Sequence, residues 1–82
     1  APDLVAEILS PGNSAIEMER KFELYRKAGV REYWVIEPEH QILHAYRFEG
    51  DRIFTRSFSR YDTAAVDSFP SLSIALEPVF AE

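Results

Sequence analysis

The chain has 82 residues, of which 46% are hydrophobic and 13% aromatic, and it carries a formal net charge of −5. These values exclude a disordered chain and fit one domain near the smallest size at which a single core suffices. The lack of cysteine excludes disulfides and thiolate metal sites. No run approaches the roughly 18 apolar residues of a membrane helix. The acidic balance argues against a protein that coats nucleic acid, although a local basic patch remains compatible with it. We expect a cytoplasmic protein.

Residues 2–11, PDLVAEILSP, form an apolar run typical of a central strand, with the carboxylate of Glu7 in its middle. A buried charge costs several kcal/mol unless it is paired or bound to a metal. Alternate residues of a strand share a face, so Asp3 and Glu7 are predicted on one face and Leu4 on the other. Asp3 and Glu7 are then about 13 Å apart, too far to bind one ion. A metal at Glu7 therefore requires an acid from elsewhere.

Residues 14–29, SAIEMERKFELYRKAG, predict an amphipathic helix. Met18, Phe22 and Tyr25 recur at helical spacing and give one apolar face. Gly29 is the expected left-handed residue that ends the helix. This helix follows the first strand after a short turn, so the two elements are predicted to pack together.

The rest of the chain predicts a meander of antiparallel strands. Aromatic and β-branched residues mark three strands, at residues 31–38, 41–48 and 52–59, with a hairpin turn at residues 49–51. Short extended pieces are expected within residues 66–74 and a closing turn of helix at residues 77–80. The predicted fold class is α/β, a mixed sheet with an antiparallel meander and one packed helix.

The chemistry that the residues suggest centres on Glu7 and Lys21. A strand–turn–helix unit can bring Lys21 over the end of the strand that carries Glu7. A carboxylate beside a lysine suits metal-assisted phosphodiester hydrolysis, because carboxylates hold Mg²⁺ and a lysine stabilises charge in the transition state. The alternative is a structural ion pair of Glu7, with Lys21 as a surface residue paired to Glu17 on its own helix. The spacing alone leaves both interpretations open.

Arg52, Arg56 and Arg60 alternate with Phe54 and Phe58 along one predicted strand. Basic and aromatic side chains on one face are typical of contact with single-stranded nucleic acid. Arginines on an exposed strand also protect a sheet edge, which is the alternative.

Two histidines, His40 and His44, lie near the second predicted turn. We expect no acid partner for them at metal-binding spacing, and therefore no zinc site.

Three segments together resemble a known family: PDLVAEILSP, then KFELYRKAGV on the helix, then REYWVIEPE. In this order they resemble the Uma-type family of restriction endonuclease-like proteins, a bacterial branch of the PD-(D/E)xK nuclease superfamily. The resemblance runs from Pro2 to about Glu39 and continues more weakly to residues 72–80, LSIALEPVF. It implies a restriction-endonuclease-like core and a hydrolase that cleaves DNA phosphodiester bonds with Mg²⁺ or Mn²⁺.

The resemblance also implies roles for single residues. Glu7 falls on the family's metal-binding acid, and Leu9 stands where the superfamily usually has its lysine. The matching lysine lies on the helix, at Lys21, with Glu17 on the acid one turn earlier. The resemblance thus implies Glu7 and Lys21 as catalytic residues and Glu7 as a metal ligand. Tyr25 and Trp34 also match family positions, and both are expected to pack in the core.

The superfamily's other metal-binding Asp belongs to an earlier strand, and we expect Asp3 to mark the start of its strand instead. Residues 1–82 are therefore expected to form one domain, the carboxy-terminal part of a larger nuclease-like domain. Such a part should bind metal weakly and cleave poorly or not at all. The alternative function is a non-catalytic nuclease-fold module for self-association or nucleic-acid binding. Exposed sheet edges would favour a homo-oligomer.

Overall fold

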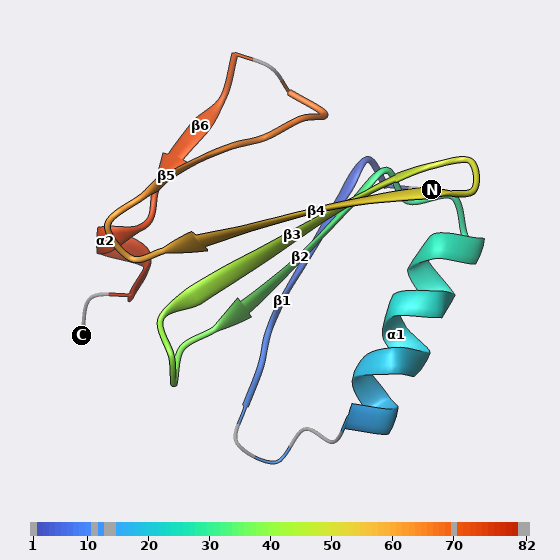
Figure 1. The fold of residues 1–82 in the computed structure, drawn as a ribbon, viewed down its shortest axis with the longest axis horizontal. Helices are drawn as coiled ribbons and strands as arrows, with labels where there is room; N and C mark the ends of the chain where they lie inside the picture. The colour runs from blue at the N-terminus through green and yellow to red at the C-terminus, as the bar shows by residue number, and fades with distance from the viewer. Residues whose placement is uncertain (1, 11, 13–14, 70, 81–82) are drawn as a thin grey trace.

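The structure is a computed structural model that describes residues 2–10, 12, 15–69 and 71–80. Figure 1 shows a four-stranded sheet with one helix on one side and a smaller unit on the other. The elements in chain order are β1 (Leu4–Ile8), α1 (Ala15–Lys27), β2 (Glu32–Glu37), β3 (Ile42–Glu49), β4 (Arg52–Ser59), β5 (Thr63–Ala65), β6 (Ser73–Ala75) and α2 (Glu77–Phe80). The expected mixed α/β fold with one packed helix is confirmed.

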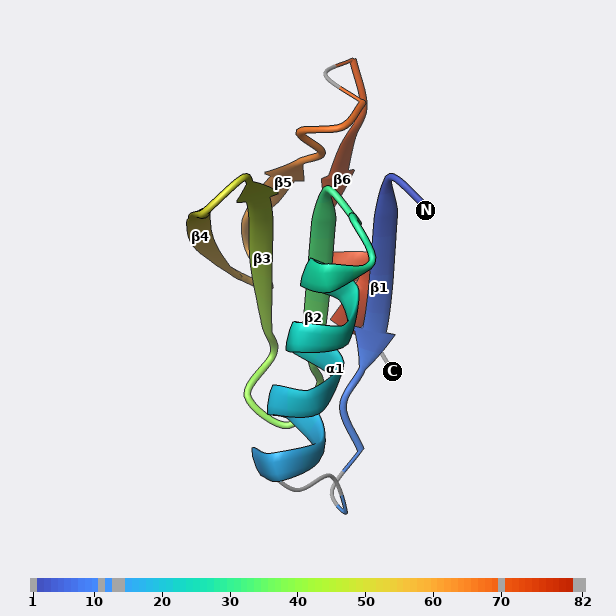
Figure 2. The same cartoon turned by 90° about the vertical axis from the view of Figure 1, so that its right-hand side faces the viewer.

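The main sheet has the strand order β1-β2-β3-β4. Strand β1 pairs in parallel with β2, and α1 makes the crossover between them. Strands β2, β3 and β4 pair antiparallel, which confirms the predicted meander. Figure 2 shows the sheet face-on, with α1 in front of it and β5, β6 and α2 behind. Gly50 has a φ of 57° in the β3–β4 turn, a conformation that glycine adopts without strain.

The prediction that the first strand is central is wrong. In the described part of the chain β1 lies at the edge of the sheet and pairs with β2 alone. Ile8 at its end is 70% exposed. An apolar sequence reports which side chains favour burial, and it does not report how many neighbours the backbone has. The composition of β1 therefore could not distinguish an edge strand from a central one.

The main hydrophobic core lies on the sheet face opposite α1. Trp34 and Leu43 of the sheet pack there against Leu76 and Phe80 from the carboxy-terminal unit. Leu43 is 1% exposed and Leu76 is fully buried. This confirms the expected core position of Trp34. Strands β5 and β6 form a separate two-stranded sheet that covers this core.

Helix α1 is held mainly by aromatic contacts. The ring of Phe22 meets Tyr46 and Phe48 edge-on, with centroids 5.1 and 5.2 Å apart. None of the helix residues is fully buried, and an apolar cavity of about 490 Å³ lies between the helix and the sheet. Gly29, with a φ of 85°, ends the helix as predicted. The helix is thus placed by a few large rings and not by a dense core. No helix of the described residues is long and apolar enough to cross a membrane.

The tail agrees with the sequence prediction in part. Strand β6 and helix α2 fall where extended structure and a helical turn were expected, but β5 begins earlier, at Thr63. A turn at residues 59–62 places it there, because the Asp62 carboxylate accepts a hydrogen bond from the Ser59 amide at 2.7 Å. Pro70, around which these pieces were expected, and Ser14, the expected start of the long helix, lie outside the described residues.

A buried carboxylate joins the tail to the sheet. Glu32 is 1% exposed and accepts hydrogen bonds from the Trp34 indole at 3.1 Å and from the Ser68 amide. The Ser68 hydroxyl donates to the Asp3 carbonyl at 3.3 Å. Buried polar groups are tolerated when they are hydrogen-bonded, so Glu32 is a structural residue that fixes the loop after β5.

We predict that Glu32→Ala lowers the free energy of unfolding by about 2–4 kcal/mol, because it leaves a buried indole donor and a part-buried amide donor without an acceptor. Glu39→Ala, at an exposed position, should change it by less than about 0.5 kcal/mol. Urea unfolding followed by circular dichroism measures both values. Equal midpoints for the two variants would contradict the structural role of Glu32.

Candidate functional site

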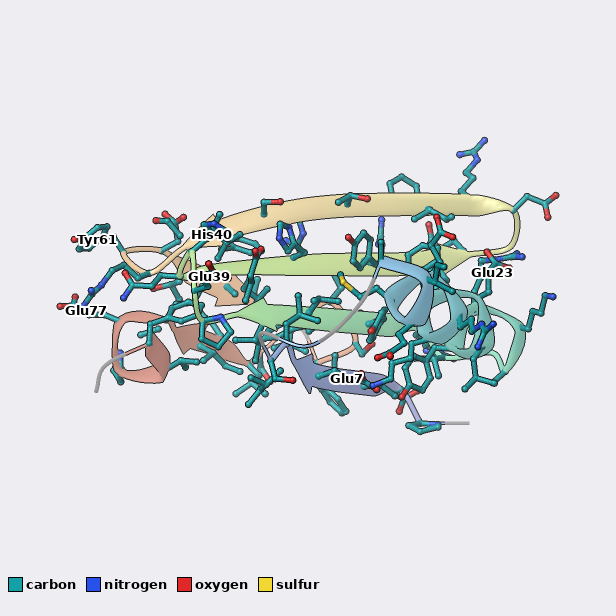
Figure 3. All side chains as sticks on the ribbon, turned by 90° about the horizontal axis from the view of Figure 1, so that it is seen from below. Glu7, Glu23, Glu39, His40, Tyr61 and Glu77 are labelled. Atoms are coloured by element: carbon teal, nitrogen blue, oxygen red, sulfur yellow. The ribbon has the colours of Figure 1, made fainter. Side chains whose placement is uncertain are left out.

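Glu7 lies on β1 on the sheet face that α1 covers. Its strand partner across the parallel ladder is Val35 of β2. The alternation of β1 points Glu7 to the helix, while Leu4 packs against the core on the other face. The Glu7 side chain remains 20% exposed. Figure 3 shows Glu7 on β1 near the helix, and its partial exposure means that the carboxylate is not sealed inside the packed interior.

Two residues of α1 bind the Glu7 carboxylate. The Lys21 ammonium lies 2.8 Å from Oε2 of Glu7, which confirms that the two predicted catalytic residues converge. The Tyr25 hydroxyl donates to the other oxygen, Oε1. Residues four apart on a helix share a face, and this spacing brings Lys21 and Tyr25 to the same carboxylate. Each oxygen of Glu7 therefore has its own donor.

The contacts shift the ionisation of all three groups. Burial would raise the pKa of Glu7, but the hydrogen bonds from Lys21 and Tyr25 outweigh it, and the pKa lies below its usual value. The same carboxylate raises the pKa of Lys21, and Glu17 adds a weaker effect in the same direction. The hydrogen bond to Glu7, followed by burial, raises the pKa of Tyr25. At neutral pH the cluster is a carboxylate, an ammonium and a neutral phenol.

Tyr25 belongs to a row of rings in contact. Its ring centroid lies 4.9 Å from that of Tyr33, and Tyr33 stacks on Tyr46 at 6.1 Å. Burial raises the pKa of Tyr33 to about 12. The expected packing role of Tyr25 therefore describes its ring, whereas its hydroxyl belongs to the site. The shared stripe of Lys21 and Tyr25, on the helix that follows the strand of Glu7, was the signal that could have predicted this contact.

The described residues do not by themselves fit a metal ion. No group of three or more potential ligands comes together among them. Asp3, the other acid of this segment, has a side chain that is 55% exposed and lies 3.7 Å from Arg31. Both oxygens of Glu7 already accept hydrogen bonds. The site thus offers a single carboxylate of the oxygen type that Mg²⁺ prefers.

Arg56 of β4 lies on the sheet face opposite α1 and has partners within the chain. Arg56 contacts the carboxylate of Asp67 at 2.9 Å and donates to the Ala65 carbonyl at 3.2 Å. Its guanidinium also lies 5.4 Å from the ring centroid of Phe58. These contacts join β4 to the tail. Contact of this face with nucleic acid stays a prediction.

The two histidines share an acid partner that the sequence pattern did not predict, while the expected absence of a zinc site stays a prediction. Glu37 lies between them, 2.5 Å from Nδ1 of His40 and 3.2 Å from Nε2 of His44. His44 also contacts the Ser57 hydroxyl at 3.3 Å across the β3–β4 pair. The spacing of Glu37 and His40 across a tight turn could have indicated the first contact, but the second required the strand register. Figure 3 shows His40 near one end of the sheet, away from α1.

Comparison with protein families gives one match. A family model described as "Putative restriction endonuclease" matches residues 1–77 of the chain. This range includes Glu7, Lys21 and Tyr25. A comparison with curated proteins finds no match.

A comparison with solved structures also finds a similar protein. The chain is similar to a crystal structure described as "a putative nuclease belonging to DUF820 from Anabaena variabilis ATCC 29413". Sequence identity is 30% and the TM-score is 0.77. The similarity covers 98% of this chain and 44% of that one, so the chain spans less than half the length of the Anabaena protein.

The Glu37–His40 contact predicts a pH dependence. The hydrogen bond to Glu37 raises the pKa of His40 above its ordinary value of 6.5. The stability from this pair is therefore lost as the pH rises from about 6.5 through the raised pKa of His40. The same contact lowers the pKa of Glu37, so the stability is fully present only above about pH 4.5, the ordinary pKa of that carboxyl, and is lost as the pH falls from there through the lowered pKa.

The measurement is an NMR titration of the His40 ring protons. Glu37→Gln should return the His40 midpoint to near its ordinary value. Glu39→Gln, which removes a neighbouring charge without a hydrogen bond to His40, should lower the midpoint less. An unchanged midpoint in Glu37→Gln would contradict the assignment.

Proposed function

The chain belongs to the Uma2 family, described as "Putative restriction endonuclease", and from this premise we propose that the protein is a metal-dependent DNA endonuclease. The reaction is hydrolysis of a DNA phosphodiester bond. The observation that carries the proposal is the convergence of Glu7 and Lys21, 2.8 Å apart, within the matched segment. The similarity to the Anabaena nuclease supports the same class of activity.

Lys21 has the properties that a phosphate-binding cation requires. Its pKa is raised, so the ammonium stays charged at neutral pH, and its side chain is 46% exposed. A lysine on a flexible stem can reach a phosphate oxygen and stabilise the charge that develops there. In this proposal Lys21 moves from Glu7 to the substrate.

Glu7 is the proposed metal ligand, with Mg²⁺ or Mn²⁺ as the ion. Because the described residues place only one carboxylate, that of Glu7, at the proposed metal site, further oxygen ligands of the ion must come from outside them. We therefore assign no catalytic step to the ion here. We expect the 82-residue chain alone to bind the ion weakly and to cleave poorly or not at all.

The second candidate is a non-catalytic nuclease-fold module that binds DNA or associates with itself. Both oxygens of the Glu7 carboxylate accept hydrogen bonds. This favours the second candidate, because such an ion pair is stable without a metal. The two candidate functions differ in whether DNA is cleaved. Salt-sensitive binding of duplex DNA without cleavage under any divalent ion would support the module.

We predict that Glu7→Ala abolishes cleavage of plasmid DNA by the full-length protein and weakens its binding of Mn²⁺ or Mg²⁺. The reason is the loss of a ligand oxygen. Nicking assays and isothermal titration calorimetry measure the two effects. A binding isotherm identical to that of the wild type would remove the metal role of Glu7.

We predict that Lys21→Met lowers kcat for DNA cleavage by about 100-fold or more. This is the usual loss when a group that stabilises charge in the transition state is removed. Lys27→Met is the matched control, because Lys27 is an exposed lysine in the last turn of the same helix. Single-turnover cleavage measures both variants. Equal activity of Lys21→Met and the wild type would exclude Lys21 from the reaction.

A further inference from the structure

The two donors that bind Glu7 differ in how firmly each is held. Lys21 reaches Oε2 on a flexible four-carbon stem, and its side chain is 46% exposed. Tyr25 reaches Oε1 from a ring that is partly buried between the helix and the sheet. The tyrosine side chain has two torsion angles, and neighbouring rings limit both.

The surroundings of Tyr25 fix its ring and its backbone. The ring lies 4.9 Å from Tyr33 at an interplanar angle of 50°, and Tyr33 is only 3% exposed. The Tyr25 carbonyl accepts a hydrogen bond from the Val30 amide at 3.1 Å, across the turn at Gly29. Tyr25 is thus held both by the helix end and by β2. Its hydroxyl is presented to β1 at a fixed place.

We propose that Tyr25 is a positioning residue for the Glu7 carboxylate. This inference rests on the proposed nuclease function, in which Lys21 leaves Glu7 for the substrate. When the ammonium leaves Oε2, the Tyr25 hydroxyl still holds Oε1. The carboxylate then keeps its orientation on an edge strand, where packing alone would leave a glutamate side chain several rotamers. Oε2 is then free of its hydrogen-bond donor.

The alternative is that Tyr25 serves packing alone. The ring supplies the packing and the hydroxyl supplies the positioning, so Tyr25→Phe separates the two roles. Tyr46→Phe is the matched control, because Tyr46 belongs to the same stack and lies on β3, two strands away from Glu7. Both substitutions remove one phenol hydroxyl and keep the ring.

The first measurement is cleavage of plasmid DNA by the full-length protein with Mg²⁺. Loss of a hydrogen bond that orients a ligand typically costs 10- to 100-fold in activity. Tyr25→Phe should therefore lower kcat by about 10- to 100-fold, with KM for DNA unchanged and only a small fall in the thermal midpoint. Tyr46→Phe should change none of the three. Equal kcat values for Tyr25→Phe and the wild type would overturn the proposal, as would a parallel loss of kcat and thermal midpoint in both variants.

The second measurement does not depend on activity. In Lys21→Met the Tyr25 hydroxyl alone holds the Glu7 carboxylate, so NMR couplings along the Glu7 side chain should report one rotamer in that variant and averaged rotamers in the double variant Lys21→Met/Tyr25→Phe. A single rotamer in the double variant would overturn the positioning role. If the wild type cleaves no DNA but the double variant averages the Glu7 rotamers, the proposed nuclease function fails and the positioning of Glu7 stands.

Discussion

The three-way contact of Glu7, Lys21 and Tyr25 connects the edge strand β1 to the helix α1. Helix α1 contributes no fully buried residue, so its position depends on a few aromatic contacts and on this polar one. The contact in turn shifts the pKa values of its members, because the carboxylate raises the pKa of both the Lys21 ammonium and the Tyr25 phenol. A change in how the helix packs would alter both the local stability and the chemistry of the site.

The sheet separates the stabilising core from the candidate site. Strand β2 shows this division in its alternation: Trp34 packs in the core with the carboxy-terminal unit, whereas the Tyr33 ring contacts Tyr25 of the helix at a tilt. Glu32, on the core face, uses its carboxylate to bind the tail and has no part in the site. The same strand thus carries a structural carboxylate on one face and supports the candidate catalytic carboxylate from the other. Substitutions on the two faces should therefore affect different properties.

The nuclease proposal and the module proposal interpret one arrangement in two ways. A carboxylate with both oxygens hydrogen-bonded is a stable structural unit, and it is also a ligand that becomes available when a mobile cation leaves. The family match supports the catalytic interpretation, because it covers the whole cluster. Glu7 is the one carboxylate that the described residues bring to the proposed metal site, and no group of three potential metal ligands comes together among them. Which interpretation holds depends on whether Lys21 exchanges Glu7 for a phosphate.

The sequence by itself determined the class of fold, the long helix with its stop at Gly29 and the three-stranded meander. Local periodicity and turn chemistry carry these features, since they depend on residues close together in the chain. Only the tertiary structure decided that β1 lies at the edge, that the Tyr25 hydroxyl reaches Glu7 and that Glu37 lies between His40 and His44. Strand order and contacts between elements arise from packing of segments distant in sequence, and no local pattern encodes a neighbour that the chain meets only after it has folded.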